Sequence, residues 1–393
     1  MKSTLREKSN SEKYKLRKKR FGTNDVTPVW VADMDINTPY FVLKAVRKRL
    51  KHPILGYEDI PKSLFKSQIK WMKKQHNVNI KLKDMIYLPS VVSSINVTIK
   101  SFSDVGDNII VQTPVYPPFF ESIKKHNREV LENKLKQNKN GGYTFDIKDL
   151  KSKINKKTKI LLLCNPHNPV GRVWTKKELT QILNICVKNN IIVFSDEIHS
   201  DLVYSPNKHI SFSSLNTNAK NISITATGVG KTFNMAGFAI SSIVISNKFL
   251  KNKFLHSYNK IHFSQGATLS HIACETAYKK GFKWLEELKI DLYSNYKGLE
   301  KLCNKYQKLI KLIPIEATYL AWLDCRGMKL NDKQLNSFFI KDAKLGLSQG
   351  ISFGGNGSGF MRLNFAVSKT NMIKIINQLE QALKKINFNK RKK

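Results

Sequence analysis

The 393-residue sequence predicts an α/β protein, with a large domain built on a mainly parallel sheet flanked by helices and a smaller α+β domain. Two observations support this fold class. Short apolar runs that end in polar or turn residues alternate with amphipathic segments from about Val46 onward. The final third changes to long polar helices and strand-like segments. We therefore expect an N-terminal arm over residues 1–45 that contributes to the small domain, a large domain over 46–280 and a C-terminal small domain over 281–393.

Five runs are predicted as buried strands because they are apolar on both faces. They are DNIIVQTP (107–114), KILLLCNP (159–166), IIVFSDE (191–197), NISITAT (221–227) and AISSIVIS (239–246). The clearest helix is TKKELTQILNICVKNN (175–190), in which Thr175 and Glu178 form a capping-box pattern. Strands that alternate with helices imply a mainly parallel sheet, and ligands bind beyond the carboxyl ends of such strands.

In the final third, polar helices near Phe282 to Leu312 precede a strand-like segment, EATYLAWLDCRG (316–327). A Gly-rich turn, GGNGSGF (354–360), and a second strand, MRLNFAV (361–367), follow. The closing helix carries Met372, Ile375, Ile376, Leu379 and Leu383 on one side. Strands followed by a helix in this order fit a smaller α+β domain packed against the first.

The formal net charge of +39 would ordinarily suggest a nucleic-acid or anionic membrane partner. Lysine is scattered along the whole chain, however, and only KYKLRKKRF (13–21) and the tail NKRKK (389–393) are concentrated. Neither has the interleaved aromatics of a single-strand binding surface, so a nucleic-acid partner is not expected. No apolar run is long enough for a membrane span, and the first twenty residues lack the apolar core of a signal peptide, so we expect a cytoplasmic protein. The five cysteines form no CxxC pair, which argues against a disulfide framework and a metal site.

The sequence GVGKT (228–232) invites comparison with a nucleotide-binding phosphate loop. That motif requires a glycine five residues before the glycine of Gly-Lys-Thr, and Thr225 occupies the position. The spacing therefore disfavours triphosphate binding by Lys231.

Chemically useful side chains follow several predicted strands. Asn168 and Asp196 follow two neighbouring strands, Tyr116 follows a third, and Lys231 follows a fourth, with His199 three residues after Asp196. An amide, a carboxylate, an aromatic ring and an amine would thus meet at one edge of one sheet. Simpler interpretations stay open for Tyr116 as a core tyrosine and for His199 as a satisfied core histidine.

This combination resembles the fold-type I pyridoxal-phosphate enzymes of the class I and II aminotransferase family, and most closely their cystathionine β-lyase branch. The matching segments, in the family's order, cover most of the chain. They are VADMDINTP (31–39), LGY (55–57), NPHNPVGRVWTKKEL (165–179), SDEIHSDLVY (195–204), KTFNMAG (231–237), TYLAWLD (318–324) and FMRLNFA (360–366).

The resemblance implies a role for each of these residues. Lys231 would carry pyridoxal 5′-phosphate as a Schiff base and, once freed by the substrate, take the proton from the substrate Cα. Asp196 would pair with the pyridine nitrogen, Asn168 would bind the phenolic oxygen and Tyr116 would stack on the ring. Arg362 would bind the substrate α-carboxylate, for which a planar bidentate donor is suited.

The cofactor phosphate is expected at the start of the helix PSVVSSI (89–95), after the strand DMIYL (84–88), near Val91 and Val92. Thr227 and His199 are also expected near the cofactor. Tyr57 would reach the phosphate and the substrate from a second subunit, which implies a homodimer with shared sites. The chain departs from the family at Gly228 and Gly230, where relatives commonly have serine, so that Thr225, Thr227, Ser93 or backbone amides would have to replace the missing hydroxyls.

The resemblance implies a carbon–sulfur β-lyase that cleaves L-cystathionine or related S-substituted L-cysteines to a thiol, pyruvate and ammonia. Because the same residues would serve transamination, an aminotransferase of the same fold stays an alternative. A regulatory or binding protein with a basic nucleic-acid-binding arm is a second alternative.

Overall fold

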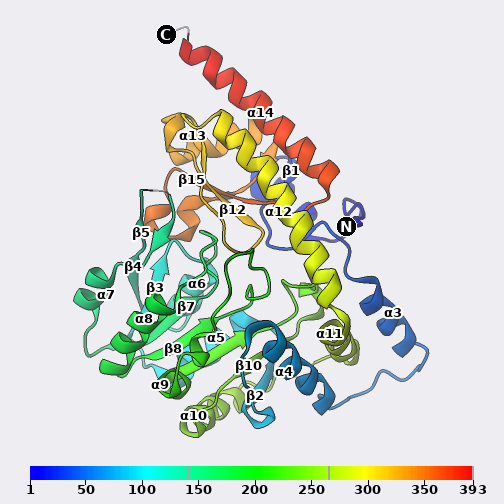
Figure 1. Cartoon of the computed structure of the whole chain (residues 1–393), viewed down its shortest axis with the longest axis vertical. Helices are drawn as coiled ribbons and strands as arrows, with labels where there is room; N and C mark the ends of the chain where they lie inside the picture. Colours follow the sequence, from blue (N-terminus) through cyan, green and yellow to red (C-terminus); the bar gives the residue numbers. More distant parts are fainter. Residues whose placement is uncertain (140, 264–265, 392–393) are drawn as a thin grey trace.

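The computed structural model describes residues 1–139, 141–263 and 266–391, the side chains of 387–391 excepted. Its main sheet has seven strands in the order β2-β10-β9-β8-β7-β3-β4 (Figure 1). Strand β10 runs antiparallel to both its neighbours, and the remaining pairs are parallel. The strands are β2 (Met85–Leu88), β3 (Asn108–Thr113), β4 (Glu129–Lys134), β7 (Thr158–Cys164), β8 (Ile192–Asp196), β9 (Ser223–Thr227) and β10 (Ser241–Val244). The predicted mainly parallel α/β sheet is confirmed.

The five runs predicted as buried strands form β3, β7, β8, β9 and β10. Strand β4, by contrast, was not predicted. It lies at the edge of the sheet, carries the charged residues Glu129, Glu132 and Lys134, and has only Asn133 buried, so its sequence lacks the apolar signature of the central strands.

Helices cover both faces of this sheet because its strands alternate their side chains between two cores. Ile110, Leu161 and Leu163 pack with α7 (Ile147–Lys153), α8 (Lys176–Lys188) and α9 (Thr217–Ile222). Ile109 and Leu162 face α5 (Val91–Phe102), α6 (Pro118–Lys125) and α10 (Lys248–Asn259). The predicted capping box of Thr175 and Glu178 begins α8.

A smaller antiparallel sheet has the order β11-β12-β15-β14, from β11 (Lys311–Leu312), β12 (Leu320–Asp324), β14 (Ser348–Gln349) and β15 (Phe360–Asn364). Helix α12 (Phe282–Lys305) ends before β11, so the region near Phe282 to Leu312 predicted as helices is one helix and a short strand. Figure 1 shows α12 beside the closing helix α14 (Lys369–Arg391) in the upper part of the molecule.

The N-terminal arm contacts this smaller sheet region, since β1 (Thr27–Pro28) pairs in parallel with β13 (Leu345–Gly346). This pairing supports the expectation that the arm contributes to the small domain, while the domain boundaries stay a prediction. The other helices are α3 (Tyr40–Arg49), α4 (Lys62–His76), α11 (Thr268–Lys280) and α13 (Asp332–Ser337), and a short hairpin joins β5 (Lys136–Gln137) to β6 (Tyr143–Thr144). Within the described ranges, no helix is long and apolar enough to cross a membrane.

The basic arm is packed onto the protein through two short helices, α1 (Glu12–Lys15) and α2 (Arg17–Phe21). The Lys13 side chain is 0% exposed, and its Nζ lies 3.1 Å from Asp33 Oδ1 and 3.2 Å from Asp35 Oδ2. Arg6 contacts the same two carboxylates at 2.6 and 2.9 Å. Arg6 and Lys13 are therefore neutralised within the chain, whereas Lys15, Lys18, Lys19 and Arg20 are exposed.

Lys13→Met is expected to lower the free energy of unfolding by about 3 kcal/mol, because removing one partner of a buried ion pair leaves the carboxylates undercompensated. Lys15→Met, on the exposed side of the same short helix, is the matched control and should change that free energy by less than about 0.5 kcal/mol. Denaturant titration of both variants measures the difference. Equal stabilities would show that the cluster formed by Arg6, Lys13, Asp33 and Asp35 does not hold the arm.

Candidate active site

One cavity with about 780 Å³ of empty space lies beyond the carboxyl ends of the parallel strands. Predicted site residues from five separate segments line it, so the structure brings together most of the expected constellation. These residues are Val91, Val92, Tyr116, Asn168, Asp196, His199 and Lys231. We call this space the site cavity.

Lys231 lies in a turn just after β9, is partly buried and lines the site cavity. Its Nζ donates a hydrogen bond of 2.7 Å to the carbonyl of Ala32. Burial, and secondarily the charge of Arg362, lowers the pKa of Lys231 to about 8. At pH 7.4 an amine with this pKa is neutral in roughly a fifth of the molecules, far more than an ordinary lysine, so this fraction can act as a nucleophile or as a base.

Asp196 is the last residue of β8 and is buried at the floor of the site cavity. Its Oδ1 accepts a hydrogen bond of 3.1 Å from the backbone N–H of Ile198. Burial raises the pKa of Asp196 to about 7, against the opposing effect of that hydrogen bond and of the Lys231 charge. Among the described residues, no cation lies within ion-pair distance of this carboxylate, so it can accept a proton or an N–H donor from a ligand.

Arg362 comes from the smaller sheet, on β15, and joins it to the site cavity. Its Nη1 donates to Asn168 Oδ1 at 3.1 Å, and its Nη2 donates to the Trp30 carbonyl at 2.7 Å. Burial lowers the pKa of Arg362 to about 10, and its Nε is buried without a hydrogen-bond partner. Over the described ranges, no carboxylate pairs with Arg362. A buried guanidinium without an acidic partner is suited to binding an anionic ligand.

His199 and Tyr116 flank the space between these groups. The His199 ring is buried, packs edge-on against Tyr319 at 6.0 Å, and leaves its Nδ1 without a hydrogen-bond partner. Burial, with the charges of Lys231 and Arg362, lowers the pKa of His199 well below its ordinary value, so the ring is neutral. Tyr116 is half-buried and offers the face or edge of its ring to a ligand.

Tyr319 and Ala32 were missed as site residues by the sequence reasoning. The Tyr319 hydroxyl donates to the Ala32 carbonyl at 2.8 Å, the same oxygen that accepts from Lys231. Tyr319 lies in the TYLAWLD segment, which was recognised without a role for its tyrosine. Ala32 acts through its backbone, which leaves no signal in its side-chain type.

The start of α5 lines one end of the site cavity and can bind an anion. Its N-cap Ser90 accepts a hydrogen bond from the N–H of Ser93, and the two hydroxyl oxygens are 2.9 Å apart. Val91 and Val92 belong to the first turn, whose N–H groups have no intrahelical acceptor. A phosphate fits such a helix terminus.

Thr227 is placed differently from the expectation. It does not line the site cavity, and its buried hydroxyl points to Met72, with 3.9 Å between Thr227 Oγ1 and Met72 Sδ. The structure therefore gives no support to a phosphate contact from this hydroxyl. Thr225 Oγ1 is likewise buried, without a hydrogen-bond partner.

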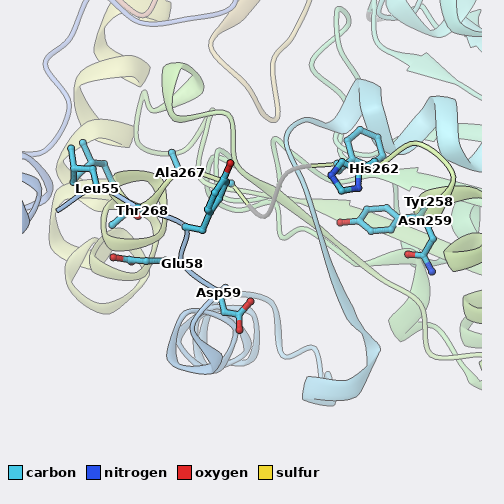
Figure 2. A pocket seen from close by; sticks show the side chains of 13 residues that line it. Leu55, Glu58, Asp59, Tyr258, Asn259, His262, Ala267 and Thr268 are labelled. Carbon is cyan, nitrogen blue, oxygen red and sulfur yellow. The ribbon is translucent and has the colours of Figure 1, made fainter.

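Tyr57 lies outside the site cavity of its own chain. It is fully exposed on the segment between α3 and α4, beside Leu55 and Ile54, which are also exposed. This segment forms one wall of a separate open pocket, shown in Figure 2, where Leu55, Glu58 and Asp59 lie across from Tyr258 and His262. The structure thus does not bring Tyr57 to Lys231 within one chain.

Comparison with known proteins gives consistent matches over nearly the whole chain. The family model described as "Aminotransferase class I and II" matches residues 30–379. Cystathionine beta-lyase PatB of Bacillus subtilis (strain 168) is 34% identical over 364 residues, covering 92% of this chain and 94% of that protein. Protein MalY of Escherichia coli (strain K12) is 31% identical over 371 residues, covering 93% and 94%.

Solved structures agree with these sequence matches. Cystalysin from Treponema denticola, in a crystal structure that contains pyridoxal 5′-phosphate, superposes with a TM-score of 0.94 and 34% identity, covering 98% of both chains. The PLP-bound C-S lyase from Staphylococcus hominis superposes with a TM-score of 0.89 and 30% identity, covering 97% of both chains.

Proposed function

The chain belongs to the class I and II aminotransferase family, and from this membership we propose that it is a pyridoxal 5′-phosphate-dependent carbon–sulfur β-lyase. Its substrate would be L-cystathionine or a related S-substituted L-cysteine, and its products a thiol, pyruvate and ammonia. The observation that carries the proposal is the pair formed by Lys231, with its lowered pKa, and the buried Asp196 in one cavity. Relatives named as cystathionine β-lyases and C–S lyases favour this reaction.

The residues of the site cavity fit pyridoxal 5′-phosphate by their chemistry. Lys231 supplies the amine for covalent attachment, and Asp196 supplies a buried acceptor for a protonated pyridine nitrogen. Asn168, whose Oδ1 is taken by Arg362, would donate from Nδ2 to the phenolic oxygen. Tyr116 would cover the ring, and the start of α5 would hold the phosphate. When bound, the cofactor supplies an electron sink for the charge that develops at the substrate Cα.

The chain's own residues account for the proton and charge movements of an elimination. Arg362 would hold the substrate carboxylate through two N–H groups and so orient the Cα–H bond. Lys231, as a neutral amine, would take that proton at Nζ, with the Ala32 carbonyl available to hold the resulting ammonium. The Cβ–S bond then breaks, and the sulfur leaves with the electron pair as a thiolate.

We also propose a homodimer in which the partner subunit's Tyr57 completes each site. The exposed Tyr57, the exposed apolar Ile54 and Leu55, and the open pocket beside them support an interface at this segment. Mixing Tyr57→Ala and Arg362→Ala proteins, each inactive alone, tests this arrangement. Hybrid dimers contain one intact site, so the mixture should recover roughly a quarter of wild-type activity. No recovery from subunits shown to exchange would contradict shared sites.

The reaction is tested by incubating cofactor-loaded protein with L-cystathionine. Pyruvate, ammonia and free thiol formed without any added keto acid support the lyase. Strict dependence on an added keto acid would contradict it and favour an aminotransferase. A cytoplasmic location is proposed together with this function, as for an enzyme of amino-acid metabolism.

For the alternative of a nucleic-acid-binding arm, Arg6 and Lys13 are held by Asp33 and Asp35, so the exposed Lys15, Lys18, Lys19 and Arg20 would have to contact the phosphates. A salt-titrated DNA-binding assay at physiological ionic strength separates the alternatives. Tight binding that depends on sequence would favour the regulatory function, whereas weak binding that salt abolishes reflects net charge alone.

Gly230→Ser is expected to strengthen cofactor binding about fivefold, because an added hydroxyl near the helix start of α5 supplies one more hydrogen bond, worth about 1 kcal/mol, to the phosphate. A Cβ at Gly230 would lie 3.6 Å from Ala236 Cα, an ordinary contact. Gly228→Ser adds the same hydroxyl at a crowded position and is the matched control, for which no gain in affinity is expected. Its Cβ would lie 3.2 Å from Ile198 Cδ1 and 3.3 Å from the Ile240 carbonyl oxygen. Spectroscopic titration of the apoproteins measures both dissociation constants. Equal affinity in Gly230→Ser and wild type would show that no phosphate oxygen lies near this position.

A further inference from the structure

A buried group of ionisable side chains lies beside the site cavity without lining it. It consists of two acid–histidine pairs, Glu197 with His209 and Asp201 with His76, and their side chains are between 0% and 6% exposed. The Glu197 Oε2 to His209 Nε2 distance is 3.0 Å, and the Asp201 Oδ1 to His76 Nε2 distance is 2.8 Å. We call these four residues the acid–histidine cluster. None of them has a role in the reaction described above.

The Glu197 end of the cluster holds the strand end that bears Asp196. Glu197 directly follows Asp196, and its Oε1 accepts hydrogen bonds from the Ser195 hydroxyl at 2.8 Å and from the Phe212 N–H at 2.9 Å. Burial would raise the pKa of Glu197, but His209 and these donors more than offset it, so the carboxylate is ionised. Ser195, the residue before Asp196, is thereby bonded to the buried carboxylate of the residue after it.

The Asp201 end of the cluster holds the turn that bears Lys231. Asp201 Oδ2 accepts from the Thr232 hydroxyl at 2.8 Å, and both its oxygens accept from Trp71 Nε1, at 3.0 and 3.1 Å. Thr232 directly follows Lys231. Burial would raise the pKa of Asp201, but His76, Thr232 and Trp71 reverse the effect, so this carboxylate is ionised as well.

The two ends meet at the histidine rings. The centroids of His76 and His209 lie 5.1 Å apart with the rings nearly perpendicular, so the two acid–histidine pairs pack as one unit. Side chains of three separate regions thus join here: His76 from the end of α4, His209 before α9, and the carboxylates after β8. The two ends are therefore joined by a ring contact between two hydrogen-bonded pairs.

The turn around Lys231 needs such support. It belongs to no helix or strand and is closed by two backbone hydrogen bonds of 3.0 Å, from the Phe233 N–H to the Val229 carbonyl and from the Met235 N–H to the Gly230 carbonyl. Two side chains anchor it: Thr232 through Asp201, and Asn234 through the carbonyls of Met34 and Ile36. Besides these backbone bonds, the acid–histidine cluster therefore supplies one of the two side-chain anchors of the turn that bears Lys231, and it also holds the strand end of Asp196.

We propose that the acid–histidine cluster is a positioning network that fixes the turn of Lys231 relative to the strand end of Asp196. The effect of the network on turnover rests on the proposed function. Its effect on the absorbance of the bound cofactor does not. The cluster residues touch neither substrate nor cofactor, so they act through Lys231 and Asp196. A misplacement of either group lowers the rate of the step that needs both.

Two substitutions test the two ends separately. Thr232→Val removes one hydroxyl while keeping the side-chain shape, and Thr232→Ser keeps the hydroxyl as its matched control. Glu197→Gln keeps a hydrogen-bonding side chain at the other end and removes its charge. The measurements are made on cofactor-loaded protein: the pH midpoint of its visible absorbance, which reports the environment of Lys231, and kcat and KM for pyruvate release from L-cystathionine.

Thr232→Val and Glu197→Gln should each lower kcat roughly tenfold with KM within about twofold, and each should shift the pH midpoint, whereas Thr232→Ser should resemble wild type. In the double variant the loss in kcat should be clearly smaller than the roughly hundredfold product of the single losses, because either change breaks the same network. If the two losses in kcat multiply in the double variant, the proposed coupling between the two ends of the cluster is overturned. An unchanged pH midpoint in folded Thr232→Val and Glu197→Gln proteins would overturn the positioning role.

Failure of this inference is distinguishable from failure of the proposed function. If wild-type protein releases no pyruvate but binds the cofactor, the lyase assignment fails, and the pH midpoints of the three variants still decide the positioning role. If Thr232→Val does not fold, the pH midpoint and kcat of Glu197→Gln are compared with those of wild type, which tests the Glu197 end of the cluster.

Discussion

Replacing Lys231 by alanine is expected to lower pyruvate release from L-cystathionine by at least about 10³-fold and to remove the covalent attachment of the cofactor. Lys231 has the only site-cavity amine among the described residues, and burial lowers its pKa to about 8. The remaining candidate base in that lining, His199, is neutral, but its Nδ1 has no partner that would orient it toward a reacting atom. Loss of the amine therefore removes both the attachment point and the base.

The measurement combines turnover with borohydride reduction of the cofactor-loaded protein. Wild type should yield a reduced, covalently labelled Lys231, and Lys231→Ala should yield no label. Lys220→Ala, an exposed lysine on α9, is the matched control and should leave both results unchanged. A small primary amine added to Lys231→Ala should restore part of the activity, because it can supply the missing base in the site cavity. A borohydride-reducible band in Lys231→Ala protein would contradict the assignment.

The central strands and the convergence of their end residues could be predicted from the sequence because both follow from local patterns. Apolar runs such as 159–164 mark buried parallel strands, and the rule that such strands end at a common edge then places Asn168, Asp196 and Lys231 together. The edge strand β4 was not predicted because it is only partly buried and carries charged residues.

Other site features could not be predicted because they depend on tertiary contacts. The Ala32 carbonyl acts through the backbone, and the ion pairs of Lys13 join residues 20 or more positions apart with no spacing rule to indicate them. Thr227 was expected near the phosphate from its place in the chain, but its hydroxyl points to Met72. Side chains alternate between the two faces of a strand, and the family motif alone did not indicate which face of β9 the Thr227 side chain occupies.

Asp196→Asn is expected to lower turnover by about 10²-fold or more, because the amide cannot hold a proton-bearing pyridine nitrogen as an ion pair and the electron sink is weakened. The substitution is nearly isosteric, so the backbone N–H of Ile198 keeps an oxygen acceptor. Cofactor affinity should fall together with turnover. Asp84→Asn, which alters a buried carboxylate that neither lines the site cavity nor belongs to the acid–histidine cluster, serves as the comparison and should leave turnover unchanged.

The same residue makes the stability of the cofactor-free protein depend on pH. Burial raises the pKa of Asp196 to about 7 in the folded state, against 3.8 for an unperturbed aspartate. Its contribution to stability is therefore fully present below about pH 4 and is lost as pH rises through about 7, because the folded state binds a proton that the unfolded state has released.

Apo Asp196→Asn protein, which has no carboxylate to ionise, should be more stable than apo wild type at pH 8 and should lose this advantage near pH 4. Added cofactor should reverse the order at pH 8, since a protonated ring nitrogen compensates the carboxylate only in wild type. Thermal unfolding of both apoproteins and both loaded proteins at the two pH values measures these differences, and a pH-independent gap between the apoproteins would show that Asp196 is ionised throughout.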